Sequence, residues 1–124
     1  MQKDLIERNP VLKQTIEFSL LVISYCEILD SLKKYIISKQ LLRSAISIGA
    51  NAMEAQNAES KADFIHKIKV VLKEIMETRV NLRIIMEKPL ISNEKVSAAF
   101  KECNELMAIF LKSIETAKKN KANN

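Results

Sequence analysis

Six polar side chains in the middle of the chain are the residues whose types and spacing could support chemistry. They recur at helical intervals, and they are Arg43, Asn51, Glu54, Lys67, Glu74 and Glu77. Paired carboxylates are the groups that acid–base catalysis or a hard metal ion requires. A di-iron bundle, however, takes a Glu-x-x-His motif from each of two helices, and His66 is the single histidine. Glu74 and Glu77 stand three residues apart with cations nearby, which is typical of ion pairs. We interpret the set as a structural polar network, with an anion-binding or partner-facing role as the alternative.

Other kinds of catalytic or cofactor site find no support in the sequence. There is one glycine, so no glycine-rich phosphate loop is present, and there is no Ser/His/Asp arrangement. Cys26 and Cys103 lie far apart among apolar neighbours, which predicts buried free thiols in a reducing compartment. We expect no catalytic residue, no metal, no cofactor and no enzymatic activity. The amino terminus lacks a signal-peptide core and the longest apolar run is short, so we expect a cytoplasmic protein without a membrane partner.

Cationic side chains form the second candidate group. The formal net charge is +5 and the isoelectric point is about 9.3, which fits contact with a polyanion but also occurs in proteins without one. Three cations fall on one side of the third predicted helix, and others lie near the carboxyl end. The candidate nucleic-acid-binding residues are Lys69, Lys73, Arg83, Lys118, Lys119 and Lys121. Aromatic residues do not alternate with them, so we expect phosphate contacts without base preference.

The elements that position these side chains are predicted to be helices. One glycine, two prolines and 5% aromatic residues argue against a β-rich architecture. Apolar residues recur at helical spacing over residues 10–33, 39–57, 61–88 and 93–119. Candidate helix starts are Pro10, Ser38, the capping box of Ser60 with Asp63, and Ser92. Four amphipathic helices with short connections predict one all-α domain over residues 1–124, an antiparallel up-and-down four-helix bundle.

The second predicted helix carries more apolar surface than one buried face needs. About half of its circumference is apolar, and much of it is small, which indicates a second packing surface and hence an oligomer. Gly49, the single glycine, lies in this helix. A glycine inside a helix costs about 1 kcal/mol relative to alanine, which suggests that another backbone approaches closely there. We therefore expect Gly49 to mark a close helix contact, in the core or between subunits.

The two middle helices carry an ordered set of residues that resembles a known family. The matching segments are Arg43-Ser44, Ser47 to Asn51, Glu54-Ala55, Ser60 to Ile65, Lys67, Lys73-Glu74, Glu77 to Arg79, and Leu82. They resemble the bacterial four-helix bundle proteins first described through intervening sequences of 23S ribosomal RNA genes. The resemblance implies a left-handed antiparallel bundle assembled as a homopentamer. The chain departs from the pattern at Val80-Asn81, where many relatives carry Tyr-Trp.

The family is also similar to the accessory proteins of diversity-generating retroelements. Those proteins are basic pentamers thought to bind nucleic acid and a reverse transcriptase. Two hypotheses for this chain follow. One is a non-enzymatic, oligomeric protein that binds RNA or DNA with little sequence preference. The other is a structural or protein-interaction module, with a reverse transcriptase or another protein as its partner and no role in nucleic-acid binding.

Overall fold

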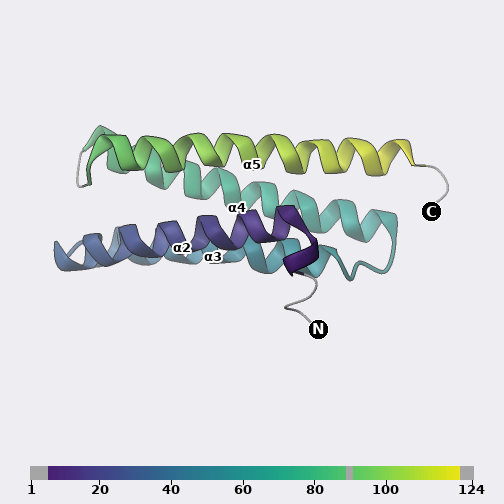
Figure 1. Ribbon diagram of the computed structural model, residues 1–124, viewed down its shortest axis with the longest axis horizontal. Coiled ribbons are helices and arrows are strands. Elements are labelled where there is room, and N and C mark those ends of the chain that lie inside the picture. The colour runs from purple at the N-terminus through teal and green to yellow at the C-terminus, as the bar shows by residue number, and fades with distance from the viewer. Residues whose placement is uncertain (1–5, 89–90, 121–124) are drawn as a thin grey trace.

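The computed structural model describes residues 6–88 and 91–120, apart from the side chain of residue 93, and this part of the chain is helical without strands. Four long helices follow in order: α2 (Pro10–Ser31), α3 (Tyr35–Ala55), α4 (Lys61–Glu87) and α5 (Asn93–Lys119). Residues 6–8 are also helical. Consecutive long helices run antiparallel along a common long axis (Figure 1). The predicted fold class, an all-α helical bundle, is confirmed.

Local capping sets two of the helix starts. Pro10 occupies the first turn of α2, and the Asn9 side chain accepts hydrogen bonds from the backbone N–H groups of Val11 and Leu12 at 3.1 and 3.2 Å. At α4, the Ser60 hydroxyl accepts from the Asp63 N–H at 3.0 Å. The Asp63 carboxylate accepts in return from the N–H of Glu59 at 3.1 Å, one residue before the position that a capping box uses. Ser92 is the N-cap residue of α5 without a side-chain cap bond.

The predicted connection between the first two helices is wrong. The sequence places the end of the first helix at residue 33 and the start of the next after Ser38, but α2 ends at Ser31 and α3 begins at Tyr35. Lys33 takes a positive φ of 60°, and this tight reversal needs fewer residues than predicted. Ser38 is buried within α3, where its hydroxyl donates to the Cys26 carbonyl at 3.2 Å. Tyr35 and Ile36 are exposed, so they carry no inward apolar pattern that would have marked the helix start.

The other helix ends differ little from the prediction. α3 ends at Ala55 and α4 at Glu87, whereas the predicted ends are residues 57 and 88, and α5 has its predicted bounds.

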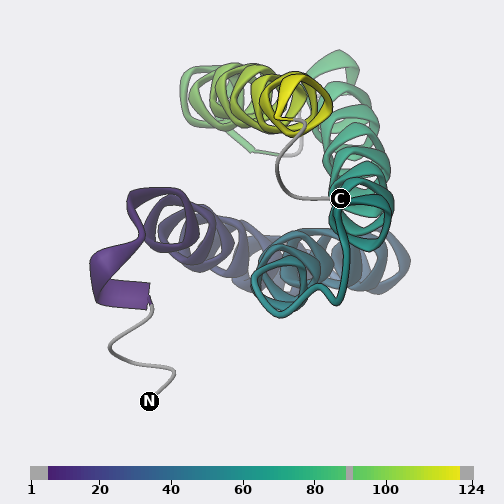
Figure 2. The same ribbon diagram turned by 90° about the vertical axis from the view of Figure 1, so that its right-hand side faces the viewer.

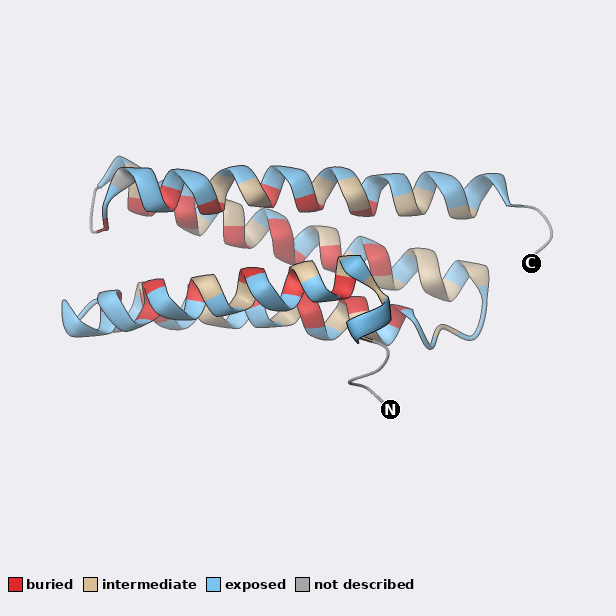
Figure 3. Ribbon diagram, viewed as in Figure 1, coloured by how far each residue is buried: buried red, intermediate tan, exposed pale blue. Residues whose placement is uncertain are grey.

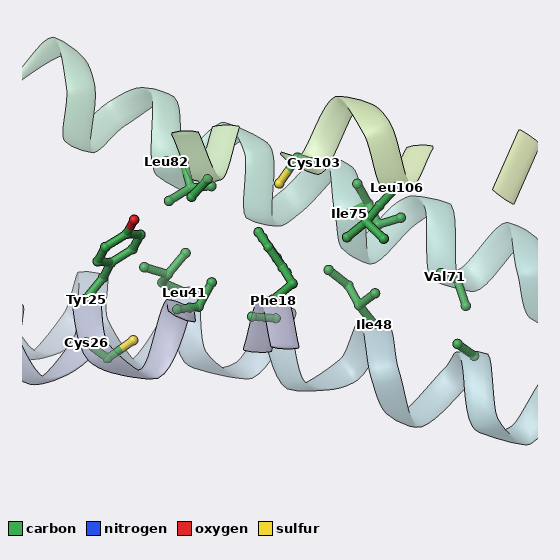
Figure 4. Close-up of a cluster of buried hydrophobic side chains, with 14 of the residues drawn as sticks. Phe18, Tyr25, Cys26, Leu41, Ile48, Val71, Ile75, Leu82, Cys103 and Leu106 are labelled. Carbon is green, nitrogen blue, oxygen red and sulfur yellow. The ribbon is translucent and has the colours of Figure 1, made fainter. Parts of the chain in front are cut away.

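The core lies between a pair formed by α2 and α3 and a pair formed by α4 and α5. Buried residues follow the inward side of the helices (Figure 3). In Figure 4, side chains from the two pairs point toward one another, with Phe18, Leu41 and Ile48 facing Ile75, Leu82 and Leu106. All six are less than 2% exposed. This apolar layer is the main stabilising feature of the bundle.

Packing around the bundle is uneven. α3 packs along both α2 and α4, and α4 packs along α5, but α2 touches α5 only sparsely. Figure 2 shows α2 and α5 as the neighbouring pair that stands farthest apart. Among the described residues, the Tyr25 hydroxyl links the two helices by donating to the Lys95 carbonyl at 2.6 Å. We call the boundary between these two helices the α2/α5 seam.

Both cysteines are free and buried, as predicted. Burial raises the pKa of the Cys103 thiol to about 12, so this sulfur stays protonated and unreactive at neutral pH. None of the helices in the described part of the chain has the length and apolar character needed to cross a membrane.

Gly49 lies on the buried side of α3 that meets α2. A methyl group at its Cα would stand 3.7 Å from both Ile16 Cδ1 and Thr15 Oγ1, an ordinary van der Waals distance. Gly49 therefore lies at a helix contact, but side chains make that contact and no foreign backbone atom comes within 4 Å of the methyl position.

Replacing Gly49 by alanine is therefore expected to stabilise the protein. The methyl group fits, and alanine removes the helix penalty of glycine, so Gly49→Ala should raise the free energy of unfolding by about 0.5–1 kcal/mol. Gly49→Leu should lower it by about 1–3 kcal/mol through overpacking. Urea denaturation of both variants tests this, and destabilisation by alanine would show that the site is tighter than the structure indicates.

Candidate functional site

Arg43 joins α3 to α4 by contacting two carboxylates. Its Nη2 lies 2.6 Å from Glu77 Oε2, and its Nη1 lies 3.4 Å from Glu74 Oε1. The hydrogen bond from Arg43 holds the pKa of Glu77 below its ordinary value, although partial burial acts the other way. The pKa of Arg43 is raised in turn, chiefly by the hydrogen bond to Glu77. Glu74 is buried and Glu77 is half-buried, so the cluster forms an electrostatic link between the two helices.

The structure brings together three of the six predicted polar residues. Asn51 donates to the carbonyl of Ser47 on its own helix at 2.8 Å. Lys67 lies 3.9 Å from Asp63, one turn earlier on α4. Glu54 is exposed and has no ion pair among the described residues. The interhelical network is therefore Arg43 with Glu74 and Glu77, and the other three residues make local contacts or face solvent.

Other polar contacts between helices lie outside the predicted site, among them two that involve α4. Inside the bundle, Thr78 Oγ1 stands 2.8 Å from Ser44 Oγ, and both residues are fully buried. On the other side of α4, Arg79 Nε donates to Asn104 Oδ1 at 2.8 Å. The Arg79 guanidinium also lies 4.5 Å from the centre of the Phe100 ring, a cation–π distance. Ser44 and Thr78 are neutral residues on the apolar sides of their helices, so no charge pattern in the sequence predicts their contact.

A groove of about 750 Å³ runs between the outer sides of α3 and α4. We call it the α3/α4 groove, and its lining residues are Gln40, Arg43, Lys69, Leu72, Lys73, Met76, Glu77, Val80 and Asn81. Lys69 and Lys73 are exposed, and neither has an ion pair in the part of the chain that the structure describes. Arg43 is engaged by its two carboxylates, so these lysines supply the remaining positive charge of the groove, and Lys73 also lies close enough to Glu77 to lower the pKa of that carboxyl.

Apolar side chains lie in the groove between the cations. Met76 and Val80 are 58% and 55% exposed, which is a large exposure for such residues. Val80 and Asn81, the two positions at which the chain departs from the pattern of the family that it resembles, both line the groove. The site therefore combines two unpaired ammonium groups with an apolar surface, an arrangement that can hold an anionic chain.

The remaining candidate cations do not join this groove. Arg83 pairs with Glu87 at 2.8 Å, and Lys119 pairs with Glu115 at 3.0 Å. Arg83 lies ten residues beyond Lys73, roughly 15 Å along α4. Lys118 is exposed near the carboxyl end of α5, and Lys121 lies outside the described residues. Sequence spacing placed Lys69, Lys73 and Arg83 on one side of α4, and of these three Lys69 and Lys73 line the α3/α4 groove.

Metal-binding chemistry has no candidate cluster in the part of the chain that the structure describes. No group of three or more His, Cys, Asp or Glu side chains gathers there with the proximity that a metal ion needs. The acidic groups nearest to the α3/α4 groove, Glu74 and Glu77, are both held by Arg43. The α3/α4 groove offers a ligand positive charge and apolar contact.

The lowered pKa of Glu77 predicts a small acid-dependent loss of stability. A carboxyl whose folded-state pKa is depressed contributes stability above its unfolded pKa, near 4.5, and the contribution disappears as the pH falls through the folded value. Glu77→Gln should remove this part of the pH dependence and cost less than about 1 kcal/mol at neutral pH, since the pair is partly exposed. The matched control is Glu87→Gln on the same helix. Denaturation curves between pH 3 and 7 measure the effect, and equal pH dependence in Glu77→Gln and the wild type would contradict it.

Comparisons with known proteins agree on one family. Residues 7–112 match the family model of the 23S rRNA-intervening sequence protein. The chain is also similar to the crystal structure of a protein of unknown function from the S23 ribosomal protein family of Bacteroides thetaiotaomicron. That alignment has 33% identity and a TM-score of 0.81, and it covers 84% of this chain and 97% of that one. A search of curated proteins finds no match. Because the family model spans most of the helical bundle, the chain belongs to the 23S rRNA-intervening sequence protein family.

Proposed function

We propose that this protein is a non-enzymatic, homo-oligomeric accessory factor that binds RNA or DNA with little sequence preference. The observation that carries the proposal is the pair Lys69 and Lys73, which line the α3/α4 groove without an ion-pair partner among the described residues. Ammonium groups one turn apart on a helix are spaced to contact phosphates of one strand. The exposed apolar side chains of Met76 and Val80 can contact a nucleic acid without base-specific hydrogen bonds.

Assembly strengthens this electrostatic argument. A single chain carries a modest formal charge of +5, and a groove with two unpaired lysines attracts a polyanion only weakly. Repetition of the groove by symmetry places several such pairs within reach of one strand, so that weak contacts combine. The family resemblance implies five copies, and we adopt that number for the proposed assembly.

The surface that we assign to assembly is the outer face of α2 and α3. Three large apolar residues of α2 and one of α3 are exposed there: Ile16, Leu20, Ile23 and Ile46. Ile16 touches the methyl position of Gly49, which places the α2 residues next to the apolar arc of α3. Burying them would contribute about 1 kcal/mol each. Because the face consists of two different helix edges, the α2 edge of one copy can pack on the α3 edge of the next, a head-to-tail contact that can close a ring.

A charge placed on the α2/α3 face should therefore dissociate the assembly. Leu20→Lys is expected to reduce the mass in solution to that of one chain, because an ammonium group cannot be buried unpaired at the contact. The matched control is Val80→Lys, which adds the same group to an exposed apolar position on α4 and should leave the mass unchanged. Light scattering with circular dichroism measures both. A wild-type monomer at micromolar concentration, or equal dissociation by the two variants, would contradict the assignment.

Binding to nucleic acid should depend on salt and on the groove lysines. The logarithm of the affinity is expected to fall linearly with the logarithm of salt concentration for both RNA and duplex DNA. Lys69→Glu with Lys73→Glu should weaken binding and reduce the slope by about 0.7 for each lysine that contacts a single strand. The control pair is Lys13→Glu with Lys101→Glu, which changes the net charge equally on α2 and α5. Equal losses in both pairs would show that only the net charge matters, and no binding of the wild type at low salt would refute this function.

The second candidate function is a protein-interaction module without a nucleic-acid role. The exposed apolar side chains in the α3/α4 groove favour it, because exposed apolar patches of this kind mark contact surfaces. A reverse transcriptase is one such partner by resemblance. Wild-type protein that forms the predicted assembly but binds neither RNA nor DNA would favour this alternative.

A further inference from the structure

A pocket lies at the end of the bundle where α2 begins and α5 ends. The pocket has a volume of about 940 Å³ and lies between the α3–α4 connection and the carboxyl-terminal part of α5. Its apolar lining residues are Ala55, Ala58, Phe64, Ala108, Ile109 and Ala117. Although α2 begins at this end, where Asn9 donates to Gln56, no α2 residue lines the pocket. Figure 2 looks at this end and shows α5 well separated from α2.

The carboxyl-terminal third of α5 lacks the packing of the rest of the helix. Its last buried residue is Phe110, and none of the residues from Leu111 to Lys119 is buried (Figure 3). The amino-terminal end of α4 is also poor in buried residues, since no residue from Lys61 to Lys67 is buried. Leu111 is 53% exposed. Two helix ends thus stand side by side without the further helix that would complete their core.

Two acidic residues of α5 lie on the same side of the helix as the pocket, nearer to its amino-terminal end. Glu102 and Glu105 precede the pocket residue Ile109 by seven and four residues, so they lie on the same helix face, roughly 6–10 Å along the axis. Glu17 of α2 faces Glu102 across the seam closely enough to act on its charge. The pKa of Glu102 is raised, first by burial and then by Glu105 and Glu17. None of these three carboxylates has an ion pair among the described residues.

We propose that the α2/α5 seam is the docking site for a cationic amphipathic helix of a protein partner. The partner's apolar face enters the pocket beside Ile109 and Phe64, and its lysine or arginine residues, one to two turns away, pair with Glu17, Glu102 and Glu105. Charge complementarity favours this partner, because the seam places three unpaired carboxylates beside an apolar pocket in a chain that is basic overall. The pocket itself carries charges of both signs, Lys61 and Lys112 beside Glu59, so the three seam carboxylates are the part of the site that selects a cationic helix.

The site is distinct from the surfaces of the proposed function. The α3/α4 groove binds a polyanion and the α2/α3 face binds another copy of the chain, so the seam remains open in the assembly. A cationic helix and a nucleic acid can then bind at the same time.

The experiment measures binding of a synthetic amphipathic helix to the full chain. The probe is a leucine–lysine peptide of about 18 residues, which spans roughly 27 Å as a helix. We expect binding at micromolar concentration, and Glu102→Gln with Glu105→Gln should weaken it about tenfold. The charge control is Glu94→Gln at the other end of α5. A peptide with glutamate in place of lysine should not bind.

A second variant and a label locate the bound peptide. Ala117→Phe fills the pocket and should weaken binding, whereas Ala62→Phe, outside the pocket lining, should not. A fluorophore on Thr116→Cys should report the peptide, and the same label on Ala50→Cys should not; the natural cysteines are buried and stay unlabelled. No binding at about 100 µM, or equal loss in test and control variants, would overturn the proposal. So would a change of assembly mass in Ala117→Phe, because it would show that a second copy occupies the seam.

Discussion

The simultaneous packing of α3 against α2 and α4 is the constraint on which the rest of the structure depends. Small residues make it possible: Ala45, Ala52 and Ala55 are buried, so two neighbouring helices can approach α3 closely. Two buried polar contacts fix the register, with Ser38 bonded to Cys26 of α2 and Ser44 to Thr78 of α4. Because such buried hydroxyls lose their partners when a helix slides, they make this three-helix arrangement specific.

The fourth helix joins this unit from one side. α5 packs on α4 and reaches α2 through few contacts, among them the bond from Tyr25 to Lys95. The seam that results has like charges across it, and ionising Glu102 there costs free energy because its pKa is raised. The bundle is therefore closely packed around α3 and loosely packed along the seam, and the two ligands that we propose have separate surfaces.

Sequence patterns predicted the parts of the fold that depend on apolar period and local capping. Pro10 and Ser60 mark helix starts because their effects are confined to one turn. Apolar periodicity did not predict the start of α3, because Tyr35 and Ile36 face outward. The residue with a positive φ in the preceding turn is Lys33 and not a glycine, so the sequence does not mark the turn either. Residue types predict an ion pair between a cation and a carboxylate of the two middle helices. That Arg43 and Glu77 form it, while Lys67 and Glu54 do not take part, depends on how each helix is rotated about its axis. The α2/α5 seam depends on how the four helices pack against one another, which no single helix encodes.

Amide hydrogen exchange of the wild-type protein, resolved by residue, tests the central claim that the bundle is organised around α3 and open at the seam. The account predicts the slowest exchange in α3 and in the part of α4 that faces it, since their backbone bonds are opened only by unfolding of the whole bundle. It predicts the fastest helical exchange in the last nine residues of α5, from Leu111 to Lys119. Equal protection of this segment and α3 would contradict the account, because it would show that the seam is closed in the free protein.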